Sequence, residues 1–392
     1  KYSYKTTQKV GTLVEGGFES YTFSDDESKI LLQKESEPIY RHSFLGKFDV
    51  KDLKSGKIIS LNNGNFVQEP KFSPDATKVA FVVDNNLYYQ DLASGKITQI
   101  TTDGKKNSII NGIGDWVYEE EFGHADFYQW SKGSDALIFV KSDESKVPEI
   151  NIPIYGKNLY PKLMTYKYPK AGEVNSTVSA HLYQLSSGKT LDLNLGSFEN
   201  YYIPQVYSTA KNDEVALATS NRHQNKVDIL KVNTSNGAVS KLISETDNAW
   251  IETDGMTLEF LDDNSFLWAS ERSGFRHLYW FDAKGNLKKP VTKGNWEITD
   301  YYGFNPKTKE VFIQTTEKGS LNKVVSKVNI SNGKMTLLSQ AEGNNRADFS
   351  KNYQYFIETS STANKPYAYT LKDGSGKSLK ELQNNDALLS KL

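Results

Sequence analysis

Short runs of alternating apolar and polar residues recur along the whole chain, and most of them lead into a polar turn that contains glycine. Residues 86–92 (NLYYQDL) and 277–282 (HLYWFD) are two such runs. A period of two places alternate side chains on one face of a β-strand, and hairpin turns need a positive φ that glycine adopts without steric cost. The pattern therefore predicts a chain of β-hairpins.

The glycine turns recur at a nearly constant spacing. They contain Gly56, Gly95, Gly188, Gly237, Gly285, Gly333 and Gly374, so the successive steps are 39, 93, 49, 48, 48 and 41 residues. A second element, an aromatic residue followed by a short turn, lies upstream of several of them, at 23–26, 72–75, 130–133, 304–307 and 349–352. This order of strands and turns at a period near 45 predicts the four-stranded blades of an all-β propeller.

The same turns predict the domain organisation. Seven turns predict at least seven blades in a single β-propeller domain that spans residues 1–392. The step of 93 residues predicts one oversized blade at about 96–188.

The composition limits the partners of the chain. It is 37% hydrophobic and 24% charged, and Lys+Arg number 47 against 48 Asp+Glu. A net charge of −1 gives no reason to expect nucleic acid or an anionic membrane surface as a partner. No run approaches about 18 consecutive apolar residues, so no membrane span is expected. The absence of cysteine excludes disulfides, cysteine metal sites and a thiol nucleophile.

The sequence contains no recognisable catalytic or metal-binding motif. No Gly-x-Ser-x-Gly occurs, so the turn that exposes the serine nucleophile of α/β-hydrolases is absent. The five histidines have no His-x-x-x-His spacing and are scattered over the chain, at His42, His124, His181, His223 and His277. We therefore expect no nucleophile, general base, metal ligand or cofactor in these 392 residues.

An acidic run stands out from the strand pattern. Residues 115–122 (DWVYEEEF) place three consecutive carboxylates beside bulky aromatic residues. Ionised carboxylates that converge are stable mainly when a cation lies between them, and an ammonium group supplies three donors. A solvated acidic turn is the alternative interpretation. Trp116 and Tyr118 alternate with acidic positions, and we expect them to support the segment by anchoring it in the core.

Residues 111–122 (NGIGDWVYEEEF) resemble the double-glutamate motif of the dipeptidyl peptidase IV branch of the prolyl oligopeptidase family. Further segments are similar to landmarks of that family and follow in the same order, at 142–149, 168–175, 271–279 and 292–297. The resemblance implies an eight-bladed propeller whose first blade is incomplete. In the family an α/β-hydrolase domain follows the propeller, and residues 382–389 resemble the stretch where one domain passes into the other.

The resemblance also implies roles for individual residues. Glu120 and Glu121 match the pair that grips the free α-amino group of a peptide, whereas Glu119 flanks the pair and is expected to face elsewhere. Arg41, in the segment YRHS at 40–43, resembles the arginine that binds the carbonyl of the substrate's second residue. An ordinary surface arginine is the alternative interpretation.

The implied function is part of a proteolytic reaction. The propeller would gate access and anchor the peptide N-terminus for a serine exopeptidase that releases Xaa-Pro or Xaa-Ala dipeptides, while the hydrolase domain supplies Ser, Asp and His. The isolated chain is then expected to be inactive. Two alternatives stay open: a stand-alone propeller that binds peptides or proteins without hydrolase activity, and an inactive homologue.

A Tyr- and Pro-rich extension lies in the oversized blade. Residues 151–169 would project as an arm or fold back on their own blade. In the family a comparable extension helps two subunits dimerise, so the resemblance implies a possible homodimer. Relatives act outside the cytoplasm, and we expect a periplasmic, cell-surface or secreted bacterial protein.

Overall fold

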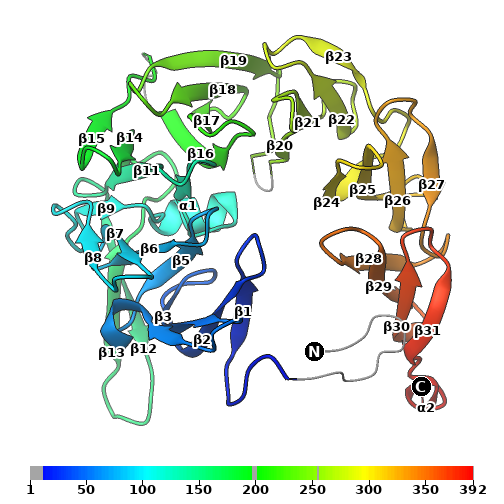
Figure 1. The fold of residues 1–392 in the computed structure, drawn as a ribbon, viewed down its shortest axis with the longest axis horizontal. Helices are drawn as coiled ribbons and strands as arrows, with labels where there is room; N and C mark the ends of the chain where they lie inside the picture. The colour runs from blue at the N-terminus through cyan, green and yellow to red at the C-terminus, as the bar shows by residue number, and fades with distance from the viewer. Residues whose placement is uncertain (1–11, 197–200, 254–255, 392) are drawn as a thin grey trace. The chain divides into compact units, whose positions relative to one another are not determined.

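The computed structural model describes residues 12–196, 201–253 and 256–391, and these are almost entirely antiparallel strands (Figure 1). Two compact units are present, Val14–Met256 and Thr257–Leu392, and each contains its own sheets. The single-domain organisation expected from the repeats stays a prediction.

Four blade sheets and one two-stranded hairpin form the first unit, and within each blade sheet the strands pair mostly in chain order. Their strands are β1 (Ser20–Phe23), β2 (Lys29–Pro38), β3 (Phe44–Asp52) and β4 (Ile58–Ser60); β5 (Gln68–Phe72), β6 (Lys78–Val83), β7 (Asn86–Asp91) and β8 (Ile97–Gln99); β9 (Ile109–Asn111), β10 (Tyr128–Trp130), β11 (Ala136–Asp143), β14 (Thr177–Gln184) and β15 (Lys189–Asp192); β16 (Tyr201–Ser208), β17 (Glu214–Asn221), β18 (Lys226–Asn233) and β19 (Val239–Thr246).

Three further elements interrupt this repetition. They are the 3₁₀ turn η1 (Leu61–Gly64), the helix α1 (Trp116–Phe122) and a separate hairpin of β12 (Glu149–Ile154) and β13 (Lys162–Lys167). The hairpin extends away from the sheet of β10, β11, β14 and β15 (Figure 1). It is called the arm below. Exposed side chains of Tyr155, Leu159 and Tyr160 occupy its tip.

Three four-stranded sheets and a short helix form the second unit. They are β20 (Leu258–Phe260), β21 (Phe266–Ser270), β22 (His277–Phe281) and β23 (Leu287–Pro290); β24 (Ile298–Asn305), β25 (Glu310–Thr315), β26 (Val324–Asn329) and β27 (Met335–Leu337); β28 (Asn344–Phe349), β29 (Tyr355–Thr362), β30 (Lys365–Asp373) and β31 (Ser378–Gln383); and α2 (Asp386–Leu389).

The predicted all-β fold of four-stranded propeller blades is confirmed. Each predicted glycine turn connects the third and fourth strands of one sheet, as Gly237 does between β18 and β19. There φ is 71°, and the Gly237 amide donates to the carbonyl of Asn233 at 2.9 Å. In the last turn the residue with positive φ is Gly376 (89°) rather than Gly374, because the Gly374 amide instead donates to the Gln354 carbonyl.

The aromatic-turn element closes the other end of several sheets. It ends the first strand and is followed by a serine whose hydroxyl accepts from the start of the second strand. Ser73 accepts from the Lys78 amide at 3.0 Å, and Ser131 accepts from the Ala136 amide at 3.0 Å. This repeated contact explains why a serine so often follows the aromatic residue.

Seven blade sheets are present in residues 12–196, 201–253 and 256–391. The sheet of β1 to β4 has all four strands, so the incomplete blade implied by the resemblance would fall on residues 1–11, which lie outside the described residues. Within each unit, neighbouring sheets pack through apolar faces, for example where Leu31 and Val50 meet Val79 and Phe81. No helix in the described part of the chain is long and apolar enough to cross a membrane.

Candidate functional site

The acidic run forms the helix α1, which has a defined start and end. Asp115 is the N-cap, and its Oδ1 accepts from the Tyr118 amide at 2.9 Å while Ser176 donates to Oδ2. Gly123 ends the helix with a φ of 73°. Burial raises the pKa of the Asp115 carboxyl, and both hydrogen bonds oppose that rise.

Aromatic packing holds α1 against the core. Tyr118 and Phe122, four residues apart, lie on one face of the helix, and their rings meet edge to face at 4.9 Å. Tyr118 also contacts the ring of Phe127, and its hydroxyl accepts from the Ile203 amide at 3.0 Å. The helix is therefore docked on β16 of the next sheet, and the direction of each glutamate is fixed by the face it occupies.

The three glutamates occupy three different environments. Neighbouring helical residues diverge by about 100°. Glu119 is 1% exposed, the Glu120 side chain is 18% exposed, and Glu121 lies at the surface. Among the described residues, Glu121 has no hydrogen-bond or ion-pair partner. Its carboxylate is thus available to a ligand.

Arg41 lies beside Glu120 although 79 residues separate them in the chain. It belongs to the connection between β2 and β3, and its Nε lies 3.2 Å from Oε1 and 3.0 Å from Oε2 of Glu120. The Arg41 side chain is 71% exposed. Only its Nε–H is engaged with the described residues, so the two terminal nitrogens remain available for an oxygen acceptor.

Glu119 contacts the same connection from inside. Its Oε1 accepts from the amides of His42 at 2.5 Å and Ser43 at 3.0 Å. A buried hydrogen bond to a charged group contributes about 1.5–3 kcal/mol, whereas an exposed ion pair contributes about 0–1 kcal/mol. The backbone contacts of Glu119 therefore hold the Arg41 loop more firmly than the ion pair of Arg41 with Glu120 does.

Trp116 does not enter the core, in contrast to Tyr118. Its half-buried ring packs on Tyr168 at 4.3 Å and Tyr166 at 6.2 Å, at the base of the arm. Tyr166 also contacts Tyr40, the neighbour of Arg41, at 5.7 Å. The arm, helix α1 and the Arg41 loop thus share one aromatic cluster, and residue spacing alone does not predict it.

A group of charged residues surrounds the connection between α1 and β10, and we did not predict it from the sequence. Lys71 of β5 forms an ion pair with Asp126, and the ring nitrogens of His124 lie 3.1 Å from the Asp126 carbonyl and 2.9 Å from that of Pro204. Burial opposes ionisation of Asp126, but the contact of His124 Nδ1 with its carboxylate at 3.4 Å and the Lys71 charge lower its pKa to about 2. These contacts link three successive sheets.

Glu69 faces this group without a hydrogen-bond partner among the described residues for its carboxylate. It sits at a β-bulge with a φ of 48°. Burial, and next the negative charge of Asp126, raise the pKa of Glu69 to about 7, although Lys71 opposes the rise. Glu69 is therefore one acidic group near α1 whose protonation changes around neutral pH, and Glu144 is another, because burial and the charge of Asp115 raise its pKa to about 7 as well.

Two further histidines, His181 and His277, have structural surroundings. His277 is buried between the Thr292 hydroxyl and the Gly294 carbonyl, each 3.0 Å away. His181 lies 2.8 Å from both Ser179 and Asp192 and stacks on Phe139. In the described ranges, no three His, Asp or Glu side chains are grouped to hold a metal ion.

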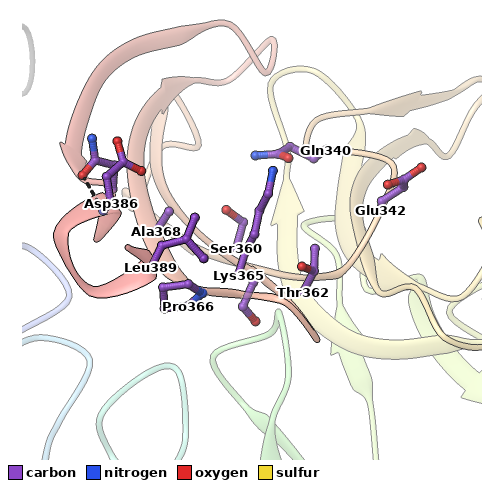
Figure 2. A pocket seen from close by; sticks show the side chains of 11 residues that line it. Gln340, Glu342, Ser360, Thr362, Lys365, Pro366, Ala368, Asp386 and Leu389 are labelled. Carbon is purple, nitrogen blue, oxygen red and sulfur yellow. Dashed lines mark hydrogen bonds between the residues drawn. The ribbon is translucent and has the colours of Figure 1, made fainter. Parts of the chain in front are cut away.

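A pocket of about 230 Å³ lies in the second unit (Figure 2). Gln340 and Glu342 line one side, and Lys365, Asp386 and Leu389 line the other. Its lining includes the carboxylates of Glu342 and Asp386 but no arginine, so it does not combine carboxylates for an ammonium group with a guanidinium for a carbonyl. The group formed by Glu120, Glu121 and Arg41 is therefore the candidate site.

Comparison with known proteins gives one consistent result. The family model of the dipeptidyl peptidase IV N-terminal region matches residues 24–367. Dipeptidyl peptidase 4 of Trichophyton rubrum is 30% identical over 397 residues, which cover 96% of this chain and 50% of that protein. The probable dipeptidyl peptidase 4 of Aspergillus flavus is 27% identical and is covered to 51%. The chain spans about half the length of the curated relatives it matches.

Solved structures agree. The crystal structure of Porphyromonas gingivalis dipeptidyl peptidase 4 superimposes with a TM-score of 0.94 at 36% identity, covering 100% of this chain and 57% of that one. A putative dipeptidyl aminopeptidase IV from Bacteroides ovatus gives a TM-score of 0.71 at 25% identity, with 88% and 51% covered.

Proposed function

Because the chain belongs to the dipeptidyl peptidase IV family, as its N-terminal propeller region, we propose that it anchors the N-terminus of a peptide for a serine exopeptidase that releases Xaa-Pro or Xaa-Ala dipeptides. The propeller gates access to a hydrolase domain, which supplies the nucleophile. Glu120 and Glu121 receive the α-ammonium group, and Arg41 receives the carbonyl of the second residue.

One observation carries this proposal most directly. Arg41 and Glu120 pair across 79 residues of sequence, and the exposed carboxylate of Glu121 follows Glu120 on the helix. An α-amino group has an ordinary pKa of about 7.7–8.0, and two adjacent carboxylates would keep it charged at neutral pH. Gripping the charged end sets the number of residues that reach the nucleophile. The distance from this site to the nucleophile would then select cleavage after the second residue, which releases a dipeptide.

The test compares two substrates on the natural protein that contains these residues. A Gly-Pro chromogenic amide with a free amino group is expected to be hydrolysed, and its N-acetylated form is expected to resist, because acetylation removes the positive charge. A serine-directed inhibitor serves as the control for the source of turnover. Equal hydrolysis of both substrates would exclude recognition of the charged N-terminus by this site. No hydrolysis of either would favour a stand-alone peptide-binding propeller.

We also propose that the arm joins two copies of the protein. Its exposed apolar side chains include Tyr155, Leu159, Tyr160 and Leu163, with exposures of 77, 88, 80 and 60%. Such a group at the tip of a two-stranded hairpin is costly in water unless another surface covers it. A second copy of the chain presents the same arm, as a two-fold symmetric interface requires.

A further inference from the structure

Glu119 differs from its two neighbours in what it contacts. It is 1% exposed, and two consecutive main-chain amides, those of His42 and Ser43, converge on its Oε1. The contact spans 77 and 76 residues of sequence. A buried carboxylate needs such donors because it has lost its water, and here the donors belong to the loop that carries Arg41.

The loop held in this way is short. It joins β2 to β3, and the Ile39 amide closes it by donating to the Ser43 carbonyl at 3.0 Å. Arg41 immediately precedes the two amides that Glu119 binds. Since those amides belong to the main chain, Glu119 fixes where the Arg41 side chain begins, whatever that side chain contacts.

Arg41 depends on this support. Its side chain is 71% exposed, so water and salt weaken its ion pair with Glu120. A long flexible side chain at the surface samples many rotamers unless its backbone is fixed. The buried Glu119 contact fixes the main chain at Arg41, and the ion pair with Glu120 then orients the Arg41 side chain.

We propose that Glu119 is a positioning residue for Arg41, an inference that rests on the function proposed above. It sets the guanidinium beside Glu120 with both terminal nitrogens directed to the carbonyl of the bound peptide. Glu119 itself touches no substrate. The three glutamates thus have different roles: Glu119 positions the arginine, Glu120 pairs with the arginine and also receives the ammonium group, and Glu121 receives the ammonium group.

A double-mutant cycle on the natural full-length protein tests this inference. Glu119→Ala is expected to lower kcat/KM for a Gly-Pro amide by about tenfold, mainly through KM, and Arg41→Ala by at least as much. If Glu119 acts through Arg41, the double variant is no worse than Arg41→Ala alone. Losses that multiply, or a Glu119→Ala variant with normal kinetics, overturn the inference.

A second measurement does not depend on catalysis. By hydrogen exchange, Glu119→Ala is expected to speed exchange of the His42 and Ser43 amides at least tenfold, while Arg41→Ala leaves them protected. Unchanged protection in Glu119→Ala overturns the inference. If Glu119→Ala does not fold, Glu119→Leu, whose side chain has no hydrogen-bond acceptor for the two amides, replaces it in both measurements with the same criteria.

A control variant and the wild-type activity distinguish failure of the proposed function from failure of the proposed role of Glu119. Glu259→Gln changes a partly buried glutamate that accepts from the Tyr301 hydroxyl in the other unit, and it should leave KM unchanged. A wild type that releases no dipeptide overturns the proposed function, and this inference falls with it. An active wild type whose cycle is additive overturns the role of Glu119 alone.

Discussion

At the scale of single residues, three identical neighbours have acquired three environments. Glu119 is enclosed and bound to main-chain amides, Glu120 is partly covered and paired with Arg41, and Glu121 is exposed. One helical turn and its docking on the core suffice to separate them. Substitutions in this run should therefore differ strongly in effect, despite identical chemistry.

The ligand pair gives the first prediction at this scale. Replacing Glu120 and Glu121 together by Gln keeps size and hydrogen bonding but removes both charges. In the natural protein this change is expected to weaken transition-state binding by about 3–5 kcal/mol, since the bound ammonium group loses both of its charged partners. Steady-state kcat/KM for a Gly-Pro amide measures the loss. Glu37→Gln, at an exposed position, is the control. Near-normal kinetics of the double variant would contradict binding of the peptide N-terminus by Glu120 and Glu121.

Glu69 gives the second prediction. Its pKa of about 7 in the folded protein exceeds the ordinary 4.5, so the folded state retains a proton that the unfolded chain has lost between these pH values. Its stabilising contribution is complete below about pH 4.5 and is lost as the pH rises through 7. This loss amounts to at most about 3 kcal/mol.

Urea unfolding at pH 5, 6, 7 and 8 measures this effect. The free energy of unfolding of wild type is expected to fall across this window, and that of Glu69→Gln is expected to fall less, because the amide does not ionise. Glu37→Gln should follow wild type. A Glu69→Gln variant with the same pH dependence as wild type would contradict the raised pKa of Glu69.

At the scale of elements, the insertions carry the candidate function while the repeated strands carry the fold. Helix α1 and the arm both lie between β9 and β14, and Trp116 and Tyr166 bring them together. Tyr40 adds the Arg41 loop to the same cluster. Because these three segments share one packing interface, the base of the arm supports the candidate site.

The arm gives the prediction at this scale. Leu159→Asp together with Tyr160→Asp places charge in the proposed interface and is expected to convert a dimer into a monomer. Sedimentation equilibrium of the natural protein measures the mass. Leu321→Asp, at a side chain 93% exposed in the other unit, is the matched control. A monomeric wild type, or a variant that stays dimeric, would show that the arm has another role.

At the scale of the whole molecule, the matched proteins are about twice as long as this chain. We expect the natural protein to exceed 44.2 kDa by a domain of about 250 residues. The 392 residues alone, folded by circular dichroism, are expected to give no turnover of a Gly-Pro amide, whereas the natural protein does. The intact mass checks the expected further domain, and the amide assay checks the expected inactivity of the 392 residues. Inhibitor-sensitive turnover by these residues alone would refute the proposal that a separate hydrolase domain supplies the nucleophile.

The sequence by itself determined the all-β fold, the spacing of its blades and their closing turns. The alternating strands, the glycine turns and the aromatic residue followed by a turn are local patterns, because the residues that form them lie close together in the sequence. The acidic run was visible for the same reason. Even here one local assignment was incomplete, since the left-handed residue of the last turn is Gly376 and not Gly374.

Only the tertiary structure decided which glutamate is buried and what each one contacts. The partners of Glu119 lie 76 and 77 residues away, and Lys71 and Asp126 are 55 apart. Lys71 and Asp126 belong to successive sheets, whereas Glu119 meets its partners because helix α1 reaches the loop between β2 and β3. No periodicity in a single chain encodes which charges will meet in this way. Burial then changes their chemistry, as the pKa of Glu69 shows, since ionisation depends on the surroundings more than on the residue type.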